Sequence, residues 1–264
     1  MDPSINHFRY EFMRLSKIQA IIQSSCPVAI QPSGLLEWHG EHNAVGLDGL
    51  KARYICERAI TLLDGGALFP VNWVGTYGFI RYPGTVCFDD DLTRGVFLKL
   101  YKELMKIGFK VVFILSGHYG QHQMKALHGA LKEARAWAKR KGLEVRLVGC
   151  KPPDMVPHVF GGDHAREFET SMLMRIAEAW DMPLVDLGCF EKGVETVPRY
   201  EHVDDEIIRE PESWDWNTDL LDESVCSAKR GEQIIEAISK GIVLEIQENL
   251  NELGILHEPL AMKR

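Results

Sequence analysis

The chain has 264 residues, of which 45% are hydrophobic and 26% are charged, as in an ordinary folded protein. This composition excludes a disordered chain, a collagen-like chain and a disulfide-stabilised scaffold. The 30 basic and 38 acidic residues give a net charge of −8 at pH 7, which argues against binding of nucleic acid through bulk charge.

No apolar run approaches the roughly 20 residues of a membrane span, and the N-terminal sequence lacks the basic start and apolar core of a signal peptide. The six cysteines are scattered without a C-x-x-C pair, which favours free thiols in a reducing compartment. We therefore expect a cytoplasmic protein with no membrane partner.

Short apolar runs alternate with helical patterns along the chain. The patterns predict strands at 28–30, 67–71, 111–115, 145–148 and 184–187, and between and after them helices over 48–63, 92–104, 124–137, 168–180 and 235–246. The run 111–115 is apolar at every position, which is typical of a strand buried on both faces of a parallel sheet. We therefore expect one α/β domain over 1–264, with a mainly parallel sheet and an irregular segment at 188–222.

Ligands of such sheets bind beyond the carboxyl ends of the strands, so the residues that follow each predicted strand are the first candidates for a site. After the first strand, Glu37 and His39 lie two residues apart, a spacing that directs both side chains to one side of an extended backbone. Asp48 follows at the start of the next helix. Such carboxylates and imidazoles are ligands of zinc, manganese and iron, although a solvated loop with a capping Asp48 is the alternative.

Two further clusters follow later strands. His118 lies between Gly117 and Gly120, and these glycines permit a tight turn that directs the imidazole into the crevice, although a histidine bonded only to backbone fits as well. The segment 161–171 places Asp163, His164 and acidic residues at the start of a helix. Glu169 in this segment is either a ligand or only a partner of the helix dipole.

Together these stretches resemble the creatininase family of metal-dependent hydrolases. The stretch 37–48 resembles the family's E-x-H-G-x-H…G-x-D motif, 116–121 its N-G-H-x-x-N motif, 164–171 its H-A-x-x-x-E-T-S motif, and 82–86 its P-G-T segment. The resemblance implies a three-layer α/β/α fold and a small cyclic substrate. It also implies a homo-oligomer, which is often a hexamer in this family. Trp214 and Trp216 would then be interface anchors, unless they cover the protein's own core.

The resemblance implies two divalent metal ions per chain, with zinc, manganese and iron all represented in the family. Glu37, Asp48 and His118 would hold one ion, and His39, Asp48 and Glu169 the other, so that Asp48 bridges the two. Two ions that share a water lower its pKa toward about 7, which supplies hydroxide to attack a substrate carbonyl.

His164 is not needed as a ligand, and we expect it to be the general acid that protonates the leaving atom, with Asp163 orienting its ring. The segment 152–162, which ends in two glycines, is expected to form a lid. Four polar side chains near the motifs are candidates for binding the substrate: Arg81, Tyr119, Gln121 and His122.

Four features depart from the family pattern, one of which is that the run 79–82 before the P-G-T segment lacks the histidine that many members carry. Creatinine-cleaving members carry a glutamate where this chain has Gly120, and two family asparagines are replaced by Ser116 and Gln121. Glu169 is therefore the expected carboxylate of the second metal. These departures argue against creatinine itself as the substrate and leave the metal ligands intact.

The leading hypothesis for function is hydrolytic opening of a small cyclic amide. A second is hydrolysis of a carbon–carbon bond in a cyclic polyol diketone, as in the 3-dehydro-scyllo-inosose hydrolases that this family includes, and the polar set around Tyr119 suits ring hydroxyls. A third is a metal-stabilised binding protein without turnover. His164 argues against the third, because a structural metal site closes its coordination shell and needs no nearby acid.

Overall fold

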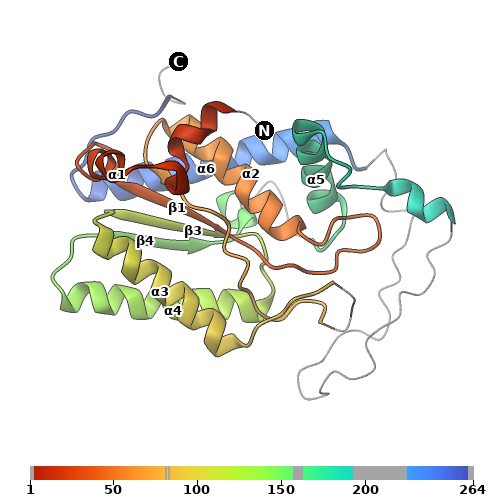
Figure 1. The fold of residues 1–264 in the computed structure, drawn as a ribbon, viewed down its shortest axis with the longest axis horizontal. Helices are drawn as coiled ribbons and strands as arrows, with labels where there is room; N and C mark the ends of the chain where they lie inside the picture. Colours follow the sequence, from red (N-terminus) through yellow and green to blue (C-terminus); the bar gives the residue numbers. More distant parts are fainter. Residues whose placement is uncertain (1–2, 81, 83, 157–162, 193–224, 261–264) are drawn as a thin grey trace.

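The structure is a computed structural model that describes residues 3–80, 82, 84–156, 163–192 and 225–260. Its centre is a parallel sheet with strand order β2–β1–β3–β4, covered by helices on both faces (Figure 1). The strands are β1 (Val28–Ser33), β2 (Ala67–Leu68), β3 (Val111–Ser116) and β4 (Arg146–Cys150). The predicted parallel α/β architecture is confirmed.

Six α-helices surround this sheet within the described residues. Helices α3 (Asp90–Ile107) and α4 (Gln121–Arg140) pack together on one face, and α2 (Leu47–Leu63), α5 (Glu167–Trp180) and α6 (Ala228–Glu252) pack on the other (Figure 1). The sixth helix is α1 (Leu15–Ile22), which precedes the sheet in the chain.

The strands bury both faces because successive side chains alternate between two cores. Val28, Val111 and Phe113 point to the core shared with α2, α5 and α6. Ala29 and Val112 point to the core shared with α3 and α4. This alternation explains why β3 is apolar at nearly every position, as the sequence predicts.

Two predicted strands differ from the structure. Strand β2 ends at Leu68 rather than at 71: the Phe69 N–H still bonds to the Ile30 carbonyl, but the next donor to β1 is the Asn72 N–H, which bonds to the Pro32 carbonyl and shifts the pairing by one residue. The segment 184–187 is not a strand of the sheet: Val185 forms one isolated antiparallel bridge with Asn43, and a 3₁₀ helix begins at Leu187. This segment instead braces the loop that follows β1. The predicted irregular segment, with both tryptophans, lies outside the described residues from 193 onward.

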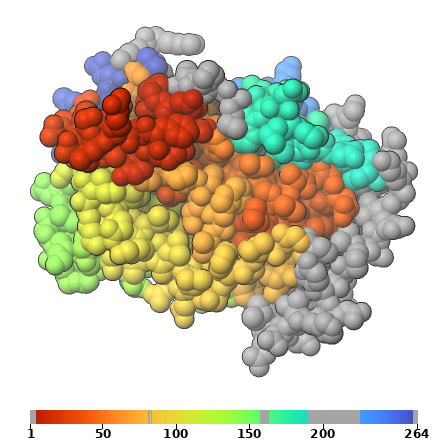
Figure 2. Space-filling view, viewed as in Figure 1, coloured from red at the N-terminus to blue at the C-terminus, as the bar shows by residue number. Residues whose placement is uncertain are grey.

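The N-terminal segment covers the β2 edge of the sheet, where an exposed strand would otherwise present unpaired backbone groups. Arg9 forms a parallel bridge with Leu68, and the ring of Tyr10 stacks on that of Phe69 at 4.1 Å. Figure 2 shows this red segment lying across the same face as the orange residues that follow α2. None of the helices described here is both long and apolar enough to cross a membrane.

Candidate metal centre

The carboxyl ends of β1 and β3 lie side by side, and their register pairs Ser33 with Ser116. The loop after Ser33 carries Glu37 and His39, and the turn after Ser116 carries His118. Two clusters that are some eighty residues apart in the sequence therefore meet at one edge of the sheet, as expected for this fold.

Gly117 allows the third element, the start of α2, to approach the same point. A Cβ at Gly117 would lie 2.0 Å from the carbonyl oxygen of Asp48 and 3.2 Å from the Cβ of Ala52. Only a residue without a side chain lets the first turn of α2 rest against the end of β3. This contact brings the Asp48 carboxylate to the side chains that follow β1 and β3.

The first predicted ligand cluster is assembled in the structure. The Nδ1 atom of His118 lies 2.9 Å from Oε2 of Glu37 and 3.3 Å from Oδ2 of Asp48. All three side chains are buried, and their closest ligand atoms lie within 4.8 Å of one another. The spacing suits three ligands of one ion; their role as ligands stays a prediction.

The orientation of His118 makes this cluster suitable for a cation. Its Nε2–H donates to the carbonyl oxygens of Thr76 at 3.0 Å and Tyr77 at 3.2 Å, so Nδ1 carries the lone pair of the neutral ring. Nδ1 and the nearby carboxylate oxygens are then all acceptors. A proton or a metal ion is therefore needed between them. In metal sites, a ligand histidine usually donates its other ring N–H to a backbone carbonyl or a carboxylate, as His118 does here.

The second predicted cluster is also assembled. Nε2 of His39 lies 3.5 Å from Oδ1 of Asp48 and 3.7 Å from Oε2 of Glu169. The other ring nitrogen, Nδ1, donates to the backbone carbonyl of Glu37 at 3.0 Å, which directs Nε2 toward the carboxylates. Asp48 belongs to both clusters, as predicted for a bridging residue.

While the rings of His39 and His118 are neutral, three buried atoms of these clusters have no hydrogen-bond partner within the described part of the chain: Glu37 Oε2, His39 Nε2 and Asp48 Oδ2. Leaving such groups unsatisfied costs about 1–3 kcal/mol each, and more for charged groups. All three face the shared centre of the clusters, and carboxylate oxygens with imidazole nitrogens are a donor set that zinc and manganese accept. The residues present therefore fit divalent metal ions.

Lys51 is a member of the site that sequence reasoning missed. It lies one turn after Asp48 on α2, its side chain is fully buried, and its ammonium donates to Oδ1 of Asp48 at 3.0 Å and to Oε1 of Glu169. Burial alone disfavours the charged form, but Glu169 and Asp48 outweigh this and raise the pKa of Lys51 above its ordinary value. Lys51 is therefore an ammonium inside the site.

The charges of the cluster shift the pKa values of its members. Burial lowers the pKa of His39, but the carboxylates of Asp48, Glu169 and Glu37 reverse this and raise it to about 9. The pKa of His118 is raised in the same way by Glu37 and Asp48. Metal ions and protons compete for such nitrogens, so a site of this kind binds metal with release of protons.

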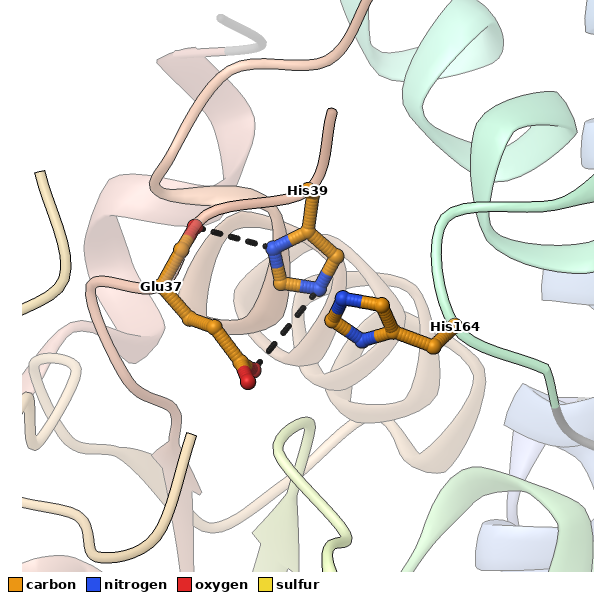
Figure 3. A group of neighbouring side chains, drawn as sticks. All are labelled: Glu37, His39 and His164. Atoms are coloured by element: carbon orange, nitrogen blue, oxygen red, sulfur yellow. Dashed lines mark hydrogen bonds and ion pairs between the residues drawn. The ribbon is translucent and has the colours of Figure 1, made fainter. Parts of the chain in front are cut away.

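His164 lies beside this centre. Figure 3 shows its imidazole facing that of His39, and the two rings stack with centroids 4.4 Å apart. Nε2 of His164 donates to the backbone carbonyl of Trp38 at 3.2 Å, and one ring nitrogen lies within 4.8 Å of ligand atoms of Glu37 and His39. Burial and then the charge of His39 lower the pKa of His164 to about 3, so its ring is neutral at pH 7.

Asp163 has a capping role in the structure. Its carboxylate accepts backbone N–H groups from Phe168 at 2.8 Å and from Glu169 at 3.2 Å, at the start of α5. Burial, followed by the charge of Glu169, raises the pKa of Asp163 to about 6. These bonds fix the first turn of α5 and with it Glu169; the predicted orientation of His164 by Asp163 stays a prediction.

The candidate substrate-binding residues are spread over the site and its surroundings. The Tyr119 hydroxyl lies 2.9 Å from Oε1 of Glu169, at the second cluster. Gln121 is exposed at the first residue of α4, and His122 pairs with Asp90 at 2.8 Å. Arg81 and the glycine end of the predicted lid lie outside the described residues. Of the candidates that the structure describes, only Tyr119 thus lies at a predicted ligand cluster.

His42, the second histidine of the E-x-H-G-x-H motif, is not a predicted ligand, and its hydrogen bonds hold the loop after β1 in place. The buried His42 donates from Nε2 to the carbonyl of Ala165 at 2.8 Å, and the His42 carbonyl accepts from the Asp186 N–H. Gly40 has φ +76°, and a Cβ there would lie 2.5 Å from the His42 ring. The E-x-H-G-x-H pattern therefore combines ligands with the residues that hold their loop.

The sequence and the fold both have known relatives. The sequence profile of the creatininase (creatinine amidohydrolase) family matches residues 11–246. A creatinine amidohydrolase of Pseudomonas putida is 26% identical over 242 residues, which cover 84% of this chain and 89% of that protein.

Solved creatininases share the fold. A manganese creatininase has a TM-score of 0.69 at 20% identity, and a mutant creatininase of zinc–zinc type has 0.71 at 22%. A mutant creatininase complexed with creatine has 0.71 at 23%. Each match covers 92% of this chain and 98% of the other. Because the family profile spans most of the sequence, this chain belongs to the creatininase family of hydrolases.

Proposed function

We propose that the protein is a metal-dependent hydrolase that opens a small cyclic amide. The observation that carries this proposal is the pair of buried carboxylate–imidazole clusters that share Asp48, with the neutral imidazole of His164 against one of them. Structural metal sites close their ligand shell, whereas this centre has an additional proton-transferring group beside it, which favours catalysis over a binding protein.

Two divalent ions, of zinc, manganese or iron, are proposed as the cofactors. Glu37, Asp48 and His118 would hold one, and His39, Asp48 and Glu169 the other. When bound, such ions polarise a carbonyl and lower the pKa of water so that it becomes a nucleophile at neutral pH. The titratable nitrogens of His39 and His118 would be deprotonated as ligands, each held in orientation by the backbone carbonyl behind it.

His164 would transfer the proton. Its Nε2–H donates to the Trp38 carbonyl, which leaves the lone pair of Nδ1 to accept the proton of the attacking water. The imidazolium formed in this way then donates that proton to the leaving nitrogen of the amide, so the residue ends the cycle neutral again. This order refines the predicted role of His164 as general acid.

The relatives favour an amide as the bond that is cleaved. The Pseudomonas putida relative is a creatinine amidohydrolase, and one related structure is a complex with creatine. None of the relatives named here is a carbon–carbon hydrolase, so the diketone alternative has no support among them. Gly120 stands where creatinine-cleaving members carry a glutamate, and Gln121 replaces an asparagine of the family pattern, so we propose a cyclic amide other than creatinine.

The test is a panel of cyclic ureides, lactams and keto-inositols, assayed with protein reconstituted with zinc or manganese. The proposal expects ring opening of at least one cyclic amide, loss of that activity after treatment with a chelator, and its return on adding metal. Glu37→Gln is the matched inactive control, because it keeps the side-chain shape and removes the ligand charge. Turnover of a keto-inositol alone would contradict the proposal.

A further inference from the structure

Lys51 is bonded to two predicted ligands of the second cluster but to only one of the first, the shared Asp48. Its ammonium bonds to Asp48 and Glu169, which are two of the three residues in the second cluster. Within the described residues, no hydrogen bond or ion pair joins it to Glu37 or His118 of the first. The two clusters therefore differ in how many of their carboxylates are already bonded to a cation of the protein itself: both in the second cluster, and only the shared Asp48 in the first.

The position of Lys51 is fixed by its surroundings. It follows Asp48 by three residues on α2, so both side chains lie on the same face of the helix. On its other side its Nζ atom lies 4.8 Å from the centroid of the Tyr119 ring, which suits a cation. A fully buried ammonium is stable only when it is paired and hydrogen-bonded, and here Asp48 and Glu169 provide both.

A metal ion in the second cluster needs the same carboxylates that Lys51 holds. Oδ1 of Asp48 bonds to Lys51 and also lies 3.5 Å from Nε2 of His39. A divalent ion bound to Asp48 and Glu169 would place two like-charged centres beside each other in a buried site, where repulsion is strong. Binding there must therefore displace the ammonium from at least one of its partners.

We propose that the Lys51 ammonium competes with the second divalent ion for Asp48 and Glu169, so that the two metal positions of this protein have unequal affinities. The position at Glu37, Asp48 and His118 fills first. The position at His39, Asp48 and Glu169 fills only at higher metal concentration. The inference rests on the proposed function in that it takes both clusters as metal sites.

The test measures metal binding rather than activity. Chelator-treated protein is titrated with Zn²⁺, and separately with Mn²⁺, in a calorimeter and against a chromophoric chelator, with the metal content confirmed by elemental analysis. Wild type is expected to bind one ion tightly and a second about tenfold or more weakly, within the usual range of coupling between ligands. The neutral variant Lys51→Met should bring the two affinities at least about tenfold closer together.

Two controls separate charge from packing. Lys51→Arg keeps the positive charge and should keep the second position weak, whereas Lys99→Met removes an exposed lysine paired with Glu103 and should change neither affinity. Circular dichroism establishes that each variant is folded. If neither Lys51 variant folds, the ratio of the two metal affinities in the wild type still tests whether the two positions differ.

Equal affinities in the wild type, within about threefold, would overturn the inference. The inference would also be overturned if Lys51→Met left the ratio of the two affinities unchanged or weakened metal binding at the second position. Lys51 would then position Glu169 rather than compete for it. Failure of the wild type to bind any metal would instead overturn the proposed function, so the two failures are distinguishable.

Discussion

The imidazole of His164 stacks on that of His39, with the ring centroids 4.4 Å apart and the planes inclined by 28°. This contact joins a residue proposed to move protons to a residue proposed to bind metal. It also explains why the two roles must be separated by experiment, since a ring this close to the cluster could itself be a ligand.

His164→Ala should keep the metal content and fold of the wild type and lose about a hundredfold or more in kcat, which is about 2.7 kcal/mol of transition-state stabilisation. Metal content and kcat are measured on the same preparation. His128→Ala, which removes an exposed histidine of α4, is the matched control. Loss of metal together with activity would make His164 a ligand, and an unchanged kcat would exclude it from catalysis.

An activated amide, whose leaving nitrogen needs no proton, should restore part of the rate that His164→Ala loses.

Gly117→Ala should destabilise the protein and weaken metal binding together. The added Cβ would collide with the Asp48 carbonyl at 2.0 Å and force α2 away from β3, which separates Asp48 from His118. Overpacking of this kind costs about 1–3 kcal/mol. Urea unfolding and a metal titration check both effects.

Gly95→Ala is the control for this prediction. Gly95 is exposed in α3 with nothing within 4 Å of an added Cβ, so alanine there should stabilise by roughly 0.5–1 kcal/mol through helix propensity. A Gly117→Ala variant with wild-type stability and metal affinity would show that the close approach of α2 does not build the site.

His42 should make the protein less stable in acid. Burial, which is the main cause, lowers the pKa of His42 to about 4 from 6.5, so between these values the unfolded chain binds a proton that the folded chain does not. Stability therefore falls as the pH falls from 6.5 toward 4, by up to about 1.4 kcal/mol per pH unit for this residue.

His42→Gln removes this titration and keeps a side-chain donor for the Ala165 carbonyl. The free energy of urea unfolding is measured between pH 7.5 and 4.5 with chelator present throughout, so that metal release does not contribute. The variant should show a smaller loss than the wild type. An equal slope in both proteins would mean that His42 is already protonated in the folded state or is not buried in solution.

We predict a homo-oligomer, up to a hexamer, from the resemblance to the creatininase family. Light scattering at micromolar concentration should give a mass of at least twice the 30.0 kDa chain. A monomer at that concentration would contradict this prediction.

Most of the site could be predicted because its residues follow strands. The fully apolar run of β3 indicates a buried parallel strand, and the carboxyl ends of such strands meet, so Glu37, His39 and His118 are expected near one edge of the sheet. Their grouping into two ligand sets comes from the family resemblance. Asp48 lies at the predicted start of the next helix, and the contact of that helix with Gly117 at the end of β3 brings its carboxylate to the same edge.

Lys51 could not be predicted from local sequence. A lysine on an amphipathic helix is normally exposed, and its burial here depends on Glu169, which is 118 residues away in the chain. The segment 184–187 differs from its predicted structure for a related reason. Its apolar residues are typical of a short strand, but its backbone bonds to the loop at His42 and Ala44 rather than to the sheet.

The shared carboxylate of Asp48 is the most direct test of the account. Elemental analysis of fully loaded protein should find about two divalent ions per chain in the wild type, as two clusters with a common ligand require. Asp48→Ala should lower the occupancy of both positions, whereas Asp91→Ala, at an exposed carboxylate outside the clusters, should lower neither. Metal content in Asp48→Ala equal to that of the wild type, or no metal in the wild type, would contradict a metal centre built on Asp48.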